Sequence, residues 1–337
     1  MEHLISSTSQ VKETNTRIIK EALLEMGSGT KIMTASRTGL SVATCNSILN
    51  ELESAGEILV VPDDNKTNSA GRPSKTYRIN ELFQVGCCLY ATNENNRFSL
   101  SYNIIDLSGH VIASKSLSQT IIDYETMKEC LLNLKEEFPT LSSVCIGLPG
   151  IITSDGVIES CDIIELEGLS LAALVKKDLQ LSCRVENDMN LIAFGLYHEK
   201  KYIENRCVVA ISFFENICSG AGIIINGSVH HGKSNFAGEV SFLPFEKDHG
   251  RRIRLPLARS ENSDIVARTI CAFVTILNPD VIMLTGQSIS INMMGPISES
   301  CMSMLPQKHM PELTYVQNTD HYYLQGLSSM IKSTLLS

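Results

Sequence analysis

The chain has 337 residues, of which 43% are hydrophobic, so it is long enough to bury at least two cores. Its net charge of −9 excludes a protein that coats nucleic acid over its whole surface, although a local cationic patch remains compatible with it. Residues 1–80 carry nine Lys/Arg and nine Asp/Glu residues, so the excess negative charge lies after residue 80. The sequence has neither an apolar run of about 18 residues nor a signal-peptide pattern, and we expect a cytoplasmic protein that does not enter the membrane.

The 11 cysteines are scattered along the chain and lie mostly in apolar runs. Their number is odd, and no two of them are separated by one or two residues. A disulfide framework or a structural zinc site requires paired or clustered cysteines. We therefore expect free thiols in a reducing compartment and no metal bound by cysteine.

The first part of the chain has the pattern of a helix-turn-helix. Apolar residues in 11–26 recur at helical spacing, and a short second helix is expected at 32–37. Gly39 permits the sharp turn that follows, and Ser41 is a suitable N-cap for a third helix. The apolar stripe of that third helix runs through residues 42–55. Helix, turn and capped helix are the arrangement with which many proteins enter the major groove of DNA.

The start of the third helix carries small polar residues that lie off its apolar stripe. They are Ser41, Thr44, Asn46 and Ser47. Such side chains can contact base edges or phosphates in a major groove. We therefore predict that these residues bind DNA.

Two short strands are expected at 58–61 and 76–79, and together they predict a β-hairpin wing. Between the strands, Arg72 and Lys75 form part of a basic arm that is able to lie on phosphates or in a narrow minor groove. The third helix has two acids near its end and no basic residue. Affinity for DNA should therefore come largely from Arg37, the wing and dimerisation. A three-helix module with a hairpin can also be a protein-docking domain.

Beyond residue 80 the chain alternates short apolar runs with helical stretches, as expected for an α/β fold. Helices are predicted at 124–138 and 264–277. Strands are predicted at 85–89, 98–107, 144–148, 207–213, 221–225 and 281–285.

Seven segments follow one another in an order typical of one protein family. They are GRPSKTYRIN (71–80), IIDLSGHVIAS (104–114), CIGLPGIIT (145–153), VENDMN (185–190), SGAGIIINGSVHHG (219–232), NFAGEVSF (235–242) and NPDVIMLTG (278–286). With the helix-turn-helix, this ordered set resembles the ROK family, which groups sugar-responsive repressors with sugar kinases. The resemblance implies a winged helix-turn-helix in 1–80. A shortened actin-like, ribonuclease H-like two-lobed ATPase-type domain is implied in 81–337, with lobes at about 81–200 and 201–337.

The resemblance also implies a ligand site in the second part of the chain. Asp188 matches the family's general base, which accepts a proton from a sugar hydroxyl. The Asn187 amide beside it can both donate to and accept from neighbouring hydroxyls, and Glu239 matches another sugar ligand of the family. A structural alternative is that these residues only cap a strand-to-helix turn and a loop.

The sequence departs from the family's kinases at the places that hold nucleotide. An early Asp-x-Gly-x-Thr turn is replaced by the residues at 87–92, and a Gly-Thr-Gly phosphate loop is replaced by 216–218. Glycine is needed there because a β-carbon obstructs the approach of backbone amides to phosphate oxygens. Without these cradles, Asp188 alone cannot supply phosphoryl transfer, which depends on positioning and neutralising the phosphate. We therefore expect no enzymatic activity and no cofactor.

The family's zinc and sugar-binding segment is altered as well. A Gly-His pair is replaced by Ser241 and Phe242, the cysteine cluster after it is missing, and the stretch from 242 to 278 is short. His230 and His231 are adjacent, and we expect them to be surface residues rather than metal ligands.

Three functions are compatible with these observations. The preferred one is a homodimeric transcriptional regulator, most simply a repressor, that binds a double-stranded operator and responds to a sugar or another small effector. The alternatives are an active ROK-type sugar kinase with an added domain, and an interaction protein whose two parts have both lost their activity.

Overall fold

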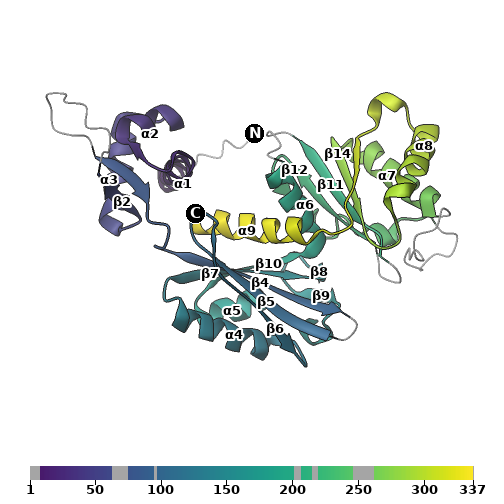
Figure 1. The fold of residues 1–337 in the computed structure, drawn as a ribbon, viewed down its shortest axis with the longest axis horizontal. Coiled ribbons are helices and arrows are strands. Elements are labelled where there is room, and N and C mark those ends of the chain that lie inside the picture. Colours follow the sequence, from purple (N-terminus) through teal and green to yellow (C-terminus); the bar gives the residue numbers. More distant parts are fainter. Residues whose placement is uncertain are drawn as a thin grey trace.

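The computed structural model describes residues 8–62, 75–94, 97–200, 206–214, 219–245 and 262–336. Within these ranges the chain forms an N-terminal helical module and two five-stranded sheets, and the last helix, α9 (Asp320–Leu336), runs between the two sheets toward the module (Figure 1). No helix in the described part of the chain is long and apolar enough to cross a lipid bilayer.

The N-terminal module is a helix-turn-helix with a small antiparallel sheet. Its elements are α1 (Thr8–Met26), β1 (Gly29–Thr30), α2 (Lys31–Thr38), α3 (Val42–Ala55), β2 (Ile58–Val61) and β3 (Thr76–Ile79), with strand order β1-β3-β2. Gly39, at φ 71°, closes α2 in the left-handed conformation, which glycine adopts without steric cost. The Ser41 hydroxyl accepts a hydrogen bond from Thr44 N and begins α3. The predicted helices and wing strands are therefore present, and β1 is an additional strand.

The first lobe is a mixed sheet in the order β10-β7-β4-β5-β6. Its strands are β4 (Val85–Glu94), β5 (Arg97–Ile105), β6 (Val111–Gln119), β7 (Leu141–Leu148) and β10 (Ser182–Asn187). The helices α4 (Tyr124–Glu137) and α5 (Leu171–Leu179) cover one face and share a core with the sheet, and α9 packs on the opposite face (Figure 1). A hairpin of β8 (Gly150–Ile152) and β9 (Ile158–Cys161), followed by the short helix η1 (Ile164–Leu166), extends from the end of β7.

The second lobe is a sheet in the order β13-β12-β11-β14-β15. Its strands are β11 (Cys207–Ser212), β12 (Gly220–Ile225), β13 (Ser228–Val229), β14 (Val281–Thr285) and β15 (Glu312–Tyr315). The helices α7 (Asn262–Leu277) and α8 (Met294–Met304) pack on one face, and α6 (Asp188–Glu199) packs on the other. Three short helical turns, η2 (Val240–Phe242), η3 (Ile291–Met293) and η4 (Gln307–His309), complete the lobe. The expected boundary between the lobes adjoins residues 201–205, which lie outside the described part of the chain.

Helices α6 and α9 cross at very short distance and connect the three parts of the molecule. A β-carbon on Gly195 of α6 would overlap the carbonyl oxygen of Tyr322 in α9, and one on Gly326 would overlap the carbonyl oxygen of Leu191. At its far end, α9 places Leu335 in the hydrophobic core of the N-terminal module. One helix therefore contacts the first sheet, the second lobe and the helix-turn-helix.

Candidate functional site

The first candidate surface is the exposed face of α3. Asn46, Ser47 and Asn50 are exposed on consecutive turns, while Ser41 and Thr44 are joined through their hydroxyl groups at 2.8 Å in the N-terminal cap. Asn50, four residues after Asn46, shares its face and was missing from the sequence-based prediction. The face therefore presents two amides and a hydroxyl, groups that suit hydrogen bonding to base edges.

A lysine from the neighbouring helix supplies positive charge beside this face. Lys31, the first residue of α2, donates to the side-chain oxygen of Asn46 and, at 3.3 Å, to that of Asn50. Sequence inspection missed this residue because it lies 15 and 19 positions from its partners. The expectation that basic charge near α3 comes mainly from Arg37 and the wing is therefore incomplete.

The two acids in the second half of α3 are both ion-paired. Glu51 contacts Lys12 of α1 at 2.7 Å, and Glu53 contacts Lys75 at 2.5 Å. These pairs reduce the negative potential that the acids alone would present to a phosphate backbone. Lys75, one of the predicted DNA contacts, is therefore engaged within the module.

The remaining predicted DNA contacts lie away from α3 or outside the described residues. Arg37 is at the end of α2, where its guanidinium contacts Glu25 at 2.6 Å. Arg72 belongs to residues 63–74, which lie outside the described part of the chain.

The second candidate site is a cavity of about 330 Å³ between the two lobes. It brings together all three predicted ligand residues, Asn187, Asp188 and Glu239. It is also lined by Asp162, which follows β9, and by Ser219, which precedes β12. Sequence inspection did not select these last two residues, because Asp162 lies outside the seven segments and Ser219, the first residue of segment 219–232, matches no ligand of the family.

Asn187 and Asp188 reach the cavity because β10 runs directly into α6. The Asn187 side-chain oxygen accepts hydrogen bonds from the backbone N–H groups of Met189, at 2.8 Å, and Asn190, at 3.3 Å. Its amide nitrogen donates to the carbonyl oxygen of Gly150 at 2.7 Å. Asn187 therefore caps α6 and fixes the β8–β9 hairpin, and it also lines the cavity.

Acidic side chains gather in the cavity near the N-terminus of α6. Burial and, to a smaller extent, the nearby negative charges of Asp162 and Glu239 raise the pKa of Asp188 to about 6. Burial also raises the pKa of Asp162. Three carboxyl groups from three different segments therefore share one confined space.

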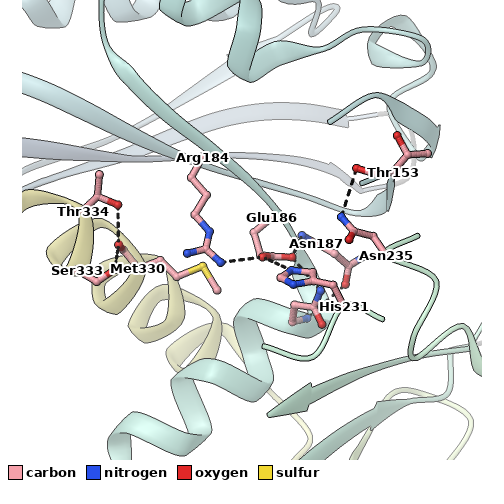
Figure 2. A network of polar contacts seen from close by, with 10 residues as sticks. Thr153, Arg184, Glu186, Asn187, His231, Asn235, Met330, Ser333 and Thr334 are labelled. Carbon is pink, nitrogen blue, oxygen red and sulfur yellow. Dashed lines mark hydrogen bonds and ion pairs between the residues drawn. The ribbon is translucent and has the colours of Figure 1, made fainter. Parts of the chain in front are cut away.

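A second polar cluster joins the lobes around Glu186, which is 4% exposed. Figure 2 shows its carboxylate between Arg184, at 3.4 Å, and the ring of His231 from the second lobe, at 2.9 Å. The amide of Asn190 also donates to it, at 2.8 Å. Burial tends to raise the pKa of Glu186, but the contacts with His231, Asn190 and Arg184 outweigh it and lower the pKa.

His231 differs from its expected role as a surface residue, because it lines the cavity and contacts Glu186. His230 is exposed, as predicted. A second contact between the lobes comes from the Asn235 amide, which donates to the Thr153 carbonyl oxygen at 3.3 Å (Figure 2). In the described ranges, no group of three or more His, Cys, Asp or Glu side chains is placed to hold a metal ion.

Glu239 is positioned by the glycine before it. Gly238 has φ +96°, and a β-carbon there would overlap the carbonyl oxygen of Ala221 in β12. Ser241 is buried and Phe242 is turned to the surface, where its ring lies 5.0 Å from that of Phe236. The pair that replaces the family's Gly-His therefore contributes no side chain to the lining of the cavity.

The residues at the place of the first nucleotide-binding turn of the family's kinases form a strand in the described part of this chain. Residues 87–92 lie within β4, which pairs without interruption with β5 from Gly86 to Glu94. Their backbone groups are used in the sheet, and Cys87, Cys88 and Leu89 are buried. The position of the second turn, 216–218, lies outside the described part of the chain.

Two sheets flanked by helices, with a cavity between them, define an actin-like, two-lobed ATPase-type fold, here preceded by a winged helix-turn-helix. The sequence model of the ROK family matches residues 98–252, and the chain contains a ROK family domain.

Comparison with individual proteins agrees with this assignment. The chain is 24% identical over 238 residues to a xylose repressor of Staphylococcus xylosus, an alignment that covers 68% of this chain and 60% of that protein. A ROK family transcriptional regulator, described as a homolog of the E. coli MLC protein, has a TM-score of 0.72 at 18% identity and covers 97% of this chain and 98% of its own. A ROK hexokinase from Thermus thermophilus has a TM-score of 0.60 at 13% identity and covers 75% of this chain and 99% of its own.

Proposed function

We propose that the chain is a sequence-specific transcriptional regulator of the repressor type, which acts as a cytoplasmic homodimer on double-stranded DNA. The ROK domain cavity takes a sugar or sugar-derived effector, and the protein has no kinase activity. The xylose repressor and the ROK transcriptional regulator among the similar proteins support this assignment. Two copies related by a two-fold axis would contact two half-sites of a palindromic operator.

The exposed face of α3 carries this proposal. Asn46 and Asn50 lie on one side of the helix, where asparagine side chains can pair with adenine in a major groove. Lys31 adds a cation beside them, and the acids farther along α3 are paired with lysines. A face with these hydrogen-bonding groups and little net negative charge suits contact with a duplex.

The proposed lack of kinase activity is supported by the first phosphate cradle, which is replaced by a continuous strand. Phosphoryl transfer depends on groups that orient and neutralise the phosphates, and a strand whose amides pair with its neighbours offers none. We expect no ATP-dependent phosphorylation of a sugar by the purified chain. Turnover that is abolished by Asp188→Asn would instead establish the alternative, an active kinase.

The DNA-binding proposal is tested by selecting duplexes that bind the full-length chain and measuring the dissociation constant of the selected site. Lys31→Ala should weaken binding roughly tenfold, because it removes one cationic contact at the duplex. The matched control is Lys128→Ala on α4, where the lysine contacts Asp178 of the ROK domain. Equal affinity of all three proteins, or no selected sequence, would refute the assignment of α3. Arg72→Ala and Lys75→Ala extend the same test to the wing.

A further inference from the structure

One loop of the second lobe contacts the first lobe at two points beside the cavity. Residues 230–239, here called the cavity loop, follow β13. The ring of His231 contacts Glu186 of β10 at 2.9 Å. The amide of Asn235 donates to the carbonyl oxygen of Thr153, which follows β8, at 3.3 Å (Figure 2). His231 and Asn235 also line the cavity, so both contacts between the lobes lie at its wall.

The cavity loop is fixed to the sheet of its own lobe. Near its start, the backbone N–H of His230 donates to the carbonyl oxygen of Ile223 in β12 at 2.8 Å. Near its end, the backbone N–H of Ala221, also in β12, donates to the carbonyl oxygen of Gly238 at 2.8 Å. A loop held at both ends moves with the strand that holds it. Its two contacts with the first lobe therefore connect the lobes as wholes.

The two carboxylate oxygens of Glu186 have different partners. Its Oε1 accepts from the backbone N–H of Asn187 at 3.1 Å and from the side-chain amide of Asn190 at 2.8 Å. Its Oε2 contacts Arg184 at 3.4 Å and His231 at 2.9 Å. Asn187, Asn190 and Arg184 lie within four residues of Glu186 along the chain, so a carboxylate that loses His231 is still hydrogen-bonded.

The hydrogen of the contact between the lobes belongs to His231. Burial opposes ionisation of Glu186, but His231, Asn190 and Arg184 hold its pKa below the ordinary value. An ionised carboxylate only accepts hydrogen bonds, so the imidazole donates from Nε2. Opening this contact breaks one hydrogen bond and leaves no isolated buried charge, which makes the contact suited to reversible release.

We propose that the contacts of His231 with Glu186 and of Asn235 with Thr153 form a clasp that holds the two lobes together at the cavity and limits access to it. When the clasp is released, the second lobe moves away with the cavity loop, and Glu186 stays in place on its local partners. A ligand enters or leaves the cavity in this open form. The proposed function enters only in that the cavity is taken as the effector site.

The experiment uses a native cysteine as a reporter of access. Cys161 lines the cavity and is half-buried, and Cys207, at the start of β11, is half-buried away from the lining and serves as the internal reference. Iodoacetamide labels the full-length protein at one pH, and mass spectrometry gives the labelling rate at each cysteine. His231→Phe keeps a planar ring but has no donor. It should raise the rate at Cys161 relative to Cys207 roughly tenfold, because a hydrogen bond to a charged group is lost.

Two matched variants test the cause. His231→Gln retains an N–H donor and should restore the native rate at Cys161. His230→Ala alters the exposed neighbour and should also label at the native rate.

The outcomes separate the clasp from the proposed function. A native rate at Cys161 in His231→Phe, or a rate in His231→Gln as high as in His231→Phe, would overturn the clasp. An equal rise at Cys207 would show general loosening of the fold and would overturn it as well. Labelling requires no effector. DNA binding by the same preparation of the native chain, measured without sugar, tests the regulator independently.

Discussion

Two opposing effects act on the ionised form of Asp188. It is the first residue of α6, where the backbone N–H of Met189 donates to its carboxylate at 2.7 Å. It also faces the like charges of Asp162 and Glu239 inside the cavity, so burial and repulsion raise its pKa to about 6. Binding sites often contain an acidic residue in surroundings that destabilise its ionised form, because a bound ligand can offset that cost.

The pH dependence of stability follows from that raised pKa. Between the ordinary value of 3.8 and about 6, the folded chain binds more protons at Asp188 than the unfolded chain does. Its contribution to stability therefore falls as pH rises through this window. Asp188→Asn should be more stable than the native chain at pH 7, by on the order of 2 kcal/mol, and nearly equal to it at pH 4. Thermal unfolding at both pH values measures the difference, and a variant that is less stable at pH 7 would contradict the prediction.

At the scale of secondary-structure elements, the crossing of α6 and α9 depends on two glycines. Gly195 faces the carbonyl oxygen of Tyr322, and Gly326 faces that of Leu191. Each helix thus supplies a glycine where the other's backbone passes. The first turn of α6 also carries Asp188, so the crossing determines where the cavity carboxylate lies relative to α9.

Gly195→Ala should therefore destabilise the chain by about 2 kcal/mol or more, because the added methyl group overlaps the backbone of α9. Gly295→Ala is the matched control, since Gly295 is also helical, in α8, and has no neighbouring atom within 4 Å of the added carbon. That control should be neutral or more stable by up to about 1 kcal/mol, because alanine favours helix. Urea unfolding of both variants compares the two free energies, and similar values would show that the crossing tolerates a side chain.

At the scale of the whole molecule, α9 links the cavity to the helix-turn-helix. One side of α9 packs on α6, and its last turn buries Leu335 and Leu336 in the core of the N-terminal module. A ligand can change DNA affinity only if it favours one arrangement of the two parts over another. The continuous packing from α6 through α9 connects the cavity with the N-terminal module, so a ligand that shifts α6 also acts on the position of the module.

We expect Leu335→Ala to weaken the coupling between effector and DNA. The variant removes buried contacts worth about 2–5 kcal/mol, while the cavity and the face of α3 remain in place. The ratio of DNA dissociation constants with and without the bound sugar effector should move toward one, and by reciprocity the effector's affinity should respond less to DNA. Leu132→Ala, an exposed position on α4, is the control. An unchanged ratio in Leu335→Ala would exclude α9 as the connection.

The sequence alone determined the local elements of this protein. The helix that ends at Met26, the turn at Gly39, the cap at Ser41 and the buried strand β7 follow from patterns within a few neighbouring residues. The order of the seven segments also predicted the fold, and it placed Asn187, Asp188 and Glu239 in one site. Helices α6 and α9 escaped prediction. In α6, consecutive residues from Met189 to Ala193 are buried, so no polar face marks a helical period.

Tertiary structure decided which distant side chains meet. Lys31 reaches Asn46 from another helix, His231 reaches Glu186 across 45 positions, and Asp162 joins the carboxylates of the cavity. Such contacts depend on how whole elements pack, which periodicity within one segment does not encode. The charge of the cavity and the cation beside α3 therefore emerged only when the chain was folded.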